Sequence, residues 1–221
     1  MDSPFLQRFL KVIPIILCLT ACAQADKQYS EILASGDLSS SEYSNSFFKF
    51  KIKFPEKWVI LSKEETARRN RMGREMLKAD SLIDDNTNTD PRFLFNIDKY
   101  RQDAIEAINE SAGFQISFLK KKYLSASNGR EFLEHARKLV ANKDFYKMIG
   151  GIDNIKIGGK DFATSKAELH IKGFTIYQRN FIANINDCLF IIDMSWRGKG
   201  DLHLKNVEQE LNNILQSLTF Q

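Results

Sequence analysis

The sequence has few residues of the types that commonly build metal or catalytic sites. It contains 3 His among 221 residues, and none of them has companions at the spacing that zinc ligands use. Of its 3 Cys, two lie within or beside an apolar N-terminal stretch, so we expect no internal disulfide framework. A Gly-x-Ser-x-Gly nucleophile motif is also missing. The sequence therefore predicts no metal and no cofactor.

A strong excess of one charge is missing as well. The formal net charge is +4 and the basic residues are spread along the chain, whereas a nucleic-acid interface needs them concentrated on one face. We therefore expect no nucleic-acid partner. With 43% hydrophobic residues in 221, the chain is long enough for one globular domain with a sizeable core.

The N-terminus has the pattern of an export signal. Arg8 and Lys11 precede the apolar run Val12–Ala23, which is shorter than the roughly 20 residues of a membrane-spanning helix. The sequence Leu19-Thr20-Ala21-Cys22 resembles the bacterial lipobox, in which a signal peptidase cuts before a cysteine that carries a diacylglyceryl group. We predict a signal peptide over residues 1–21, and lipid attachment, with fatty acyl groups such as palmitate, at Cys22.

Ordinary secretion, with cleavage after Ala23 or Ala25, is the alternative. In lipoprotein signals an aspartate after the cysteine favours retention in the inner membrane. Here that residue is Ala23, which by resemblance predicts anchoring to the outer membrane, facing the periplasm, if the organism has one. Residues 22–46 are polar and rich in Ser, and we interpret them as a lipidated N-terminus and flexible tether. A single folded domain is predicted over residues 47–221.

Two central strands organise that domain. Phe174–Ile185 and Cys188–Trp196 are apolar on both alternating faces, so each needs a layer above and a layer below. Gly158-Gly159 is predicted to be a hairpin turn and not a phosphate-binding loop, because no helix follows it. Alternation or short apolar runs predict further strands at Phe48–Phe54, Trp58–Leu61, Phe93–Lys99, Phe114–Leu119, Ile152–Ile157 and Lys160–Ile171.

Three helices complete the prediction. Ser62 and Glu65 form a capping box that opens a helix to about Ile83, Asn128 or Ser127 caps a second, and a third begins near Asp201. The second and third have apolar stripes that should pack on the sheet. These stripes are Phe132, Leu133, Ala136, Leu139 and Val140 in one, and Leu204, Val207, Leu211, Ile214, Leu215 and Leu218 in the other. The predicted fold class is α+β, an antiparallel β-sheet sandwiched between helices.

The first of these helices has a basic ridge. Arg71, Arg74 and Lys78 lie roughly opposite the apolar Met72 and Met76, so we expect them to face solvent. On a tethered protein such a ridge could contact anionic headgroups or an acidic partner. The alternative is a solvated face on which acidic residues of the same helix cancel most of the charge.

The loop that follows has part of a calcium-binding pattern. Asp84, Asn86, Asn88 and Asp90 have the spacing of oxygen ligands in such a loop. The required Gly and the final Glu are replaced, the Gly by Thr89. We therefore interpret the Asp84–Asp90 loop as a polar turn, and cation binding as the alternative.

Candidate catalytic side chains are few. Asp193 and Ser195 share one face of a strand, and His170 could lie on a neighbouring strand, which would allow a Ser/His/Asp arrangement. Hydroxyls and carboxylates on a strand face usually only form hydrogen bonds. Cys188 is predicted to be a buried small hydrophobe and not a nucleophile.

Four segments carry a resemblance to a known family. They are Phe50–Trp58, Ile157–Phe162, the long hairpin with Gln178 and Phe190, and Ile214–Phe220. In this order they resemble the PsbP-like domains, which include DcrB-like bacterial envelope lipoproteins. The resemblance implies a PsbP-like α/β/α sandwich and no catalytic residues.

The leading hypothesis is a lipid-anchored, noncatalytic envelope protein that acts as a protein-binding or assembly module. Its expected contacts are the membrane, through the N-terminal lipid, and an envelope protein. One alternative is a carrier of a small apolar ligand between the sheet and the helices. The other is a hydrolase that uses Asp193 and Ser195.

Overall fold

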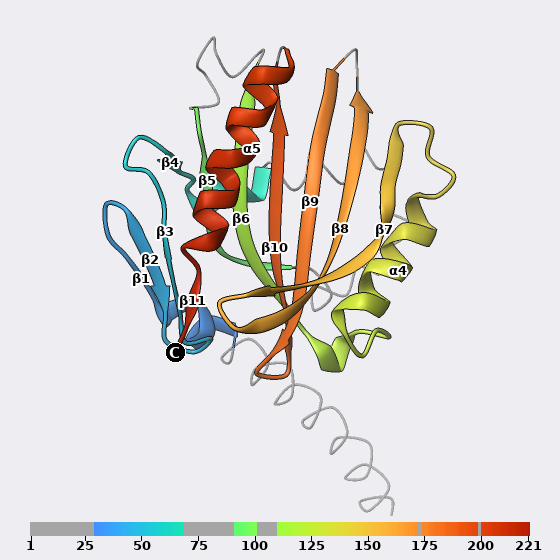
Figure 1. Ribbon diagram of the computed structural model, residues 1–221. Coiled ribbons are helices and arrows are strands. Elements are labelled where there is room, and N and C mark those ends of the chain that lie inside the picture. The colour runs from blue at the N-terminus through green and yellow to red at the C-terminus, as the bar shows by residue number, and fades with distance from the viewer. Residues whose placement is uncertain (1–28, 69–90, 101–109, 172–173, 199) are drawn as a thin grey trace, which may run out of the picture. The chain divides into compact units, whose positions relative to one another are not determined.

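The structure is a computed structural model that describes residues 29–68, 91–100, 110–171, 174–198 and 200–221 (Figure 1). The chain divides into two units, Met1–Gly36 and Asp37–Gln221. The described part of the first unit contains a helix over residues 29–34. Ser35 follows it and donates its backbone N–H to the Glu31 carbonyl over 3.1 Å. No helix in the described part of the chain has the length and apolar character needed to cross a membrane.

The second unit is built around a 7-stranded sheet with the order β4-β5-β6-β10-β9-β8-β7. Its neighbouring strands are all paired antiparallel. The sheet contains the predicted hairpin at its centre and the other predicted strands around it, except Phe48–Phe54, which lies in a second sheet. Its strands are β4 (Val59–Ile60), β5 (Arg92–Asp98), β6 (Ser111–Lys120), β7 (Tyr146–Ile157), β8 (Lys160–Ile171), β9 (Phe174–Ile185) and β10 (Cys188–Arg197).

A second sheet of four strands has the order β1-β2-β3-β11. Its strands are β1 (Gly36–Leu38), β2 (Glu42–Asn45), β3 (Phe50–Lys53) and β11 (Thr219–Phe220). The flexible tether predicted through residue 46 is therefore wrong over its last part. Tyr43 and Asn45 are buried, because β2 pairs antiparallel with β3 and turns these two side chains inward.

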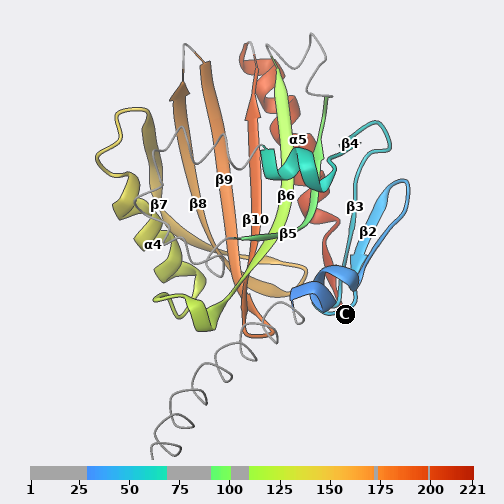
Figure 2. The same ribbon diagram turned by 180° about the vertical axis from the view of Figure 1, so that it is seen from behind.

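Alternation along β10 separates two faces of the larger sheet. Leu189 and Ile191 point to one face, where they pack with Leu133 of α4 (Gly129–Val140). The even-numbered side chains, from Phe190 to Trp196, point to the other face, on which α5 (Asp201–Gln216) lies over β6 and β10. Figures 1 and 2 show α5 in front of these strands in one view and behind them in the other. An antiparallel sheet between helices is confirmed.

The face below α5 is closed by aromatic rings. Phe190 of β10 is 0% exposed, and its ring lies 5.2 Å from those of Phe48 and Phe50, between the two sheets. Phe220 of β11 adds a contact at 5.8 Å. Ser217, just after α5, joins the end of that helix to β3 by donating to the Lys53 carbonyl and accepting from the Lys53 N–H. The aromatic cluster therefore joins segments from both ends of the unit.

Local sequence signals explain how the elements begin and turn. Ser62 and Glu65 form the predicted capping box, with reciprocal bonds of 2.8 and 3.1 Å, and Asn128 caps α4 by accepting from the Glu131 N–H. Gly158 and Gly159 both have positive φ in the turn between β7 and β8. A Cβ at Gly158 would stand 2.8 Å from the Leu218 carbonyl oxygen, so this turn approaches the start of β11 closely.

Several predicted details were wrong. Phe174 is 38% exposed, so β9 is buried on both faces only near its end. Leu139 is 50% exposed, because only the first part of the predicted α4 stripe reaches the sheet. The third helix packs on β10 and β6, and its N-cap is Gly200 and not Asp201.

We predict that Phe190→Ala lowers the free energy of unfolding by about 3 to 5 kcal/mol, because truncation leaves a cavity among buried rings. Urea denaturation followed by fluorescence measures it. Leu202→Ala, at a residue of α5 that is 74% exposed, is the matched control and should change stability by less than about 0.5 kcal/mol. Equal midpoints for the two variants would contradict the described packing.

Candidate functional site

A row of polar side chains crosses the face of the larger sheet that α4 partly covers. Asn96, Gln115, Asp193 and Asn180 stand directly opposite one another on β5, β6, β10 and β9. Asn180 and Gln115 donate to the two carboxylate oxygens of Asp193 over 2.5 and 3.4 Å. Asn96 donates to Gln115 over 3.1 Å. The row is thus one hydrogen-bonded chain across four strands.

Asp193 is the charged member of this row. Among the described residues, its hydrogen-bond partners are two neutral amides. Burial raises the pKa of the Asp193 carboxyl, and the bonds from Asn180 and Gln115 oppose that rise without cancelling it. Burial first, and then the nearby Asp193 charge, also raise the pKa of Tyr146 on β7. A carboxyl with a raised pKa is the chemistry of a proton donor or acceptor.

The structure does not assemble the Ser/His/Asp arrangement. Ser195 lies on the same face as Asp193, in the next row of the sheet, opposite Gln178. His170 pairs with Thr175 near the start of β9 and points to the opposite face by alternation. Its ring nitrogen Nδ1 contacts the Thr175 hydroxyl at 3.1 Å. The three predicted candidates therefore do not meet.

The remaining candidate side chains have structural surroundings. Cys188 is buried, and burial raises the pKa of its thiol to about 11, which removes thiolate reactivity at neutral pH. His203 of α5 lies 3.3 Å from the Glu110 carboxylate, and His135 is exposed on α4. In the described part of the chain, no group of three or more His, Cys, Asp or Glu side chains could hold a metal ion.

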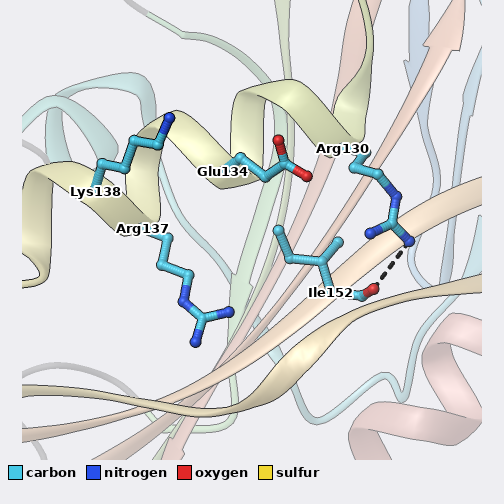
Figure 3. A pocket seen from close by; sticks show the side chains of 5 residues that line it. All are labelled: Arg130, Glu134, Arg137, Lys138 and Ile152. Atoms are coloured by element: carbon cyan, nitrogen blue, oxygen red, sulfur yellow. Dashed lines mark hydrogen bonds between the residues drawn. The ribbon is translucent and has the colours of Figure 1, made fainter.

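A second candidate site is a pocket of about 250 Å³ between α4 and β7 (Figure 3). Arg130, Glu134, Arg137 and Lys138 line it from α4, and Ile152 lines it from β7. Their spacing of four, seven and eight residues from Arg130 places them on one side of the helix. Three cationic side chains thus surround one carboxylate at the surface.

An irregularity in β7 shapes this pocket. The pairing of β7 with β8 shifts register between Ile149 and Asp153, and Gly150 in this stretch has a φ of 70°. A bulge of this kind re-aims the residues that follow it. The Ile152 side chain packs against the core under α4, and its carbonyl accepts from Nη2 of Arg130 over 2.9 Å. The bulge therefore fixes one wall of the pocket.

Sequence reasoning identified Asp193 and Ser195 but missed the rest of the row. Gln115, Asn180 and Asn96 each interrupt an otherwise apolar run, and that signal is visible in the sequence. Pairing them with Asp193 requires the strand register, which the sequence does not give. The pocket was missed too, although the recurrence of charged residues along α4 is visible.

Three predicted sites lie outside the described residues. They are Cys22, the ridge of Arg71, Arg74 and Lys78, and the Asp84–Asp90 loop. The helix that should carry the ridge is described over residues 63–68.

Comparison with known proteins finds structural neighbours. LpqN of Mycobacterium tuberculosis, described as involved in cell envelope biogenesis, is 11% identical, covers 78% of this chain and 83% of its own, and has a TM-score of 0.46. Cyanobacterial PsbP from Synechocystis is 10% identical, covers 83% of this chain and 95% of its own, and also has a TM-score of 0.46. The Ran-binding protein Mog1p of Saccharomyces cerevisiae is 10% identical, covers 81% of this chain and 94% of its own, and has a TM-score of 0.41.

All three TM-scores are below 0.5, and all three identities are 11% or less. At these TM-scores and identities the likeness concerns the arrangement of sheet and helices and not the function. No protein-family model and no curated protein sequence matches the chain.

We predict that Asp193→Asn changes the pH dependence of stability. A buried carboxyl whose folded pKa is raised destabilises the fold once it ionises, so this contribution to stability is lost as pH rises from about 4, the unfolded pKa, through the folded pKa. The variant should therefore gain stability relative to the wild type between pH 4 and neutral pH, measured by urea denaturation. Ser195→Ala, in the adjacent row and without an ionisable group, should differ from the wild type by a constant amount. A pH-independent gap for Asp193→Asn would contradict the raised pKa.

Proposed function

We propose that this protein is a lipid-anchored, noncatalytic protein of the cell envelope that acts as a protein-binding or assembly module. The observation that carries the proposal is the sequence Leu19-Thr20-Ala21-Cys22 behind a basic and apolar leader. A dual-acylated N-terminus buries enough methylene groups, at about 0.8 kcal/mol each, to hold a folded domain on a membrane. The folded unit that begins at Asp37 leaves a short segment between it and Cys22.

The chemistry of the described sites supports binding over catalysis. The carboxyl of Asp193 is held by amides, and the nearest hydroxyl candidate, Ser195, is separated from His170 by the sheet itself. The pocket beside α4 contains fixed charges without a nucleophile among its lining side chains. Fixed charges at a surface recognise partners and orient them.

The carrier alternative has less support. On one face of β10 the space is filled by aromatic rings, since those of Phe48, Phe50 and Phe220 each contact the ring of Phe190. On the other face Leu133 of α4 packs into a buried apolar cluster. Close packing of this kind leaves little room for an apolar guest between the described elements.

The ridge of Arg71, Arg74 and Lys78 is part of the proposal as a second contact surface. On a tethered domain, each such charge would contribute about 1 kcal/mol near an anionic membrane surface. Changing all three to Glu should therefore weaken salt-sensitive binding to anionic vesicles. Binding equal to that of the parent protein would leave the ridge as a solvated face.

We predict that Cys22→Ser abolishes anchoring. The wild-type protein should fractionate with membranes and have the added mass of its acyl groups at the N-terminus, because the thiol of Cys22 is the acceptor. The variant should lack that mass and leave the membrane pellet, or persist as an unprocessed precursor. Mass spectrometry of the N-terminal peptide and membrane fractionation measure both properties.

Cys18→Ser is the matched control, since Cys18 follows Leu17 and lacks the small residue required before the acceptor. This variant should behave as the wild type does. A wild-type protein that is soluble and has no acyl mass would contradict the lipoprotein proposal and favour cleavage after Ala23 or Ala25.

A further inference from the structure

We infer that the pocket between α4 and β7 binds a phosphate-bearing anion through Arg130, Arg137 and Lys138. This inference deepens the proposed function, on which it rests, by naming the chemistry that the binding module would recognise. The shared chemistry is a phosphate group, carried either by a phospholipid headgroup or by a small soluble metabolite.

Two hydrogen bonds fix the position of the Arg130 side chain. One nitrogen of its guanidinium, Nη2, donates to the Ile152 carbonyl over 2.9 Å and to Oδ1 of Asn154 over 3.4 Å. Figure 3 shows the side chain crossing from α4 to the bulge of β7. Within the described part of the chain, its Nη1 and Nε groups form no hydrogen bond. A guanidinium fixed on one side and free on the other is suited to bidentate binding of a phosphate.

Arg137 and Lys138 supply charge without an internal partner. Among the described residues, neither side chain has a hydrogen bond or an ion pair, although both line the same pocket. Cationic groups that form no ion pair repel one another, and a bound anion relieves that repulsion. The neighbouring Glu134 reduces the positive charge of the pocket. Removing the Glu134 carboxylate should therefore strengthen anion binding.

The size and openness of the pocket fit a headgroup better than a large ligand. Its volume of about 250 Å³ is below the range of roughly 300 to 1,000 Å³ for pockets that enclose drug-sized molecules. The lining is dominated by charged side chains, whereas sites for apolar ligands are lined mainly by hydrophobic ones. The pocket therefore favours a small, strongly charged group.

The first test measures soluble anions. The full mature chain, purified in neutral detergent, would be titrated with inorganic phosphate and with glycerol 3-phosphate at low ionic strength by calorimetry. We expect saturable binding that Arg137→Gln/Lys138→Gln weakens about 25-fold, since each of the two cations contributes about fivefold. Glu134→Gln should strengthen binding by a similar factor.

The second test measures the lipid source. The same chain would be placed in phosphatidylcholine vesicles with and without phosphatidylglycerol, and hydrogen exchange of the α4 amides would be followed. A lipid headgroup is identified if the α4 amides are protected only when phosphatidylglycerol is present. In Arg137→Gln/Lys138→Gln the apparent affinity for these vesicles should then fall about 25-fold. The charge-matched control is Lys57→Gln/Lys63→Gln, at exposed residues next to β4 at the opposite end of the sheet.

Binding in the first test assigns a soluble anion, and protection in the second alone assigns the lipid headgroup. The inference is overturned if neither occurs, or if the pocket variant and the control variant lose binding equally. These outcomes are separate from the anchoring test at Cys22, because titration with soluble phosphate does not depend on a lipid anchor.

Discussion

The packing of the Phe190 ring against rings from the second sheet is the contact on which the rest of the fold depends. Its partners Phe48 and Phe50 lie near the start of the unit, and Phe220 lies one residue before its C-terminus. These segments have few other ways to bury apolar surface, because β3 and β11 are short. A buried aromatic side chain removes about 150 to 250 Å² from water. The cluster thus closes the domain by joining its two ends across β10.

The opposite face of β10 contains a buried carboxyl, which lowers the stability of the fold. Asp193 occupies a position in the middle of an apolar strand, and its two amide partners compensate only part of the cost of burying a carboxylate. Hydrogen-bonded polar rows in a sheet also fix its register, since a slip of one residue would break the bonds between the amides. The row of Asn96, Gln115, Asp193 and Asn180 therefore gives the sheet a unique alignment at some cost in stability.

Local sequence patterns predict most of the helices and strands. The features that they do not predict depend on pairing between segments far apart in the sequence. The capping box at Ser62 and the Gly158-Gly159 turn depend on neighbouring residues, so the sequence alone was sufficient for them. Strand β2 is absent from the sequence prediction because its polar sequence becomes a stable strand only through the ladder with β3. The position of Asp193 on its strand was visible, but its amide partners depend on the register of four strands. The pocket depends on a bulge in β7 that meets α4, and helical periodicity alone does not predict such a meeting.

The bulge of β7 also bears on how copies of this domain behave when they are crowded. β7 is the last strand of the 7-stranded sheet, and an exposed edge of this kind is a template on which another chain could add a strand. The kink at Gly150 breaks the regular row of backbone donors and acceptors, and Arg130 occupies the Ile152 carbonyl. Lys147 and Lys156 are exposed on the same edge, where each forms an ion pair with a residue of β8, Glu168 and Asp161 respectively. On the proposed lipid anchor, copies would meet at high surface density and in similar orientations, and such an edge would keep them from polymerising laterally into a continuous sheet.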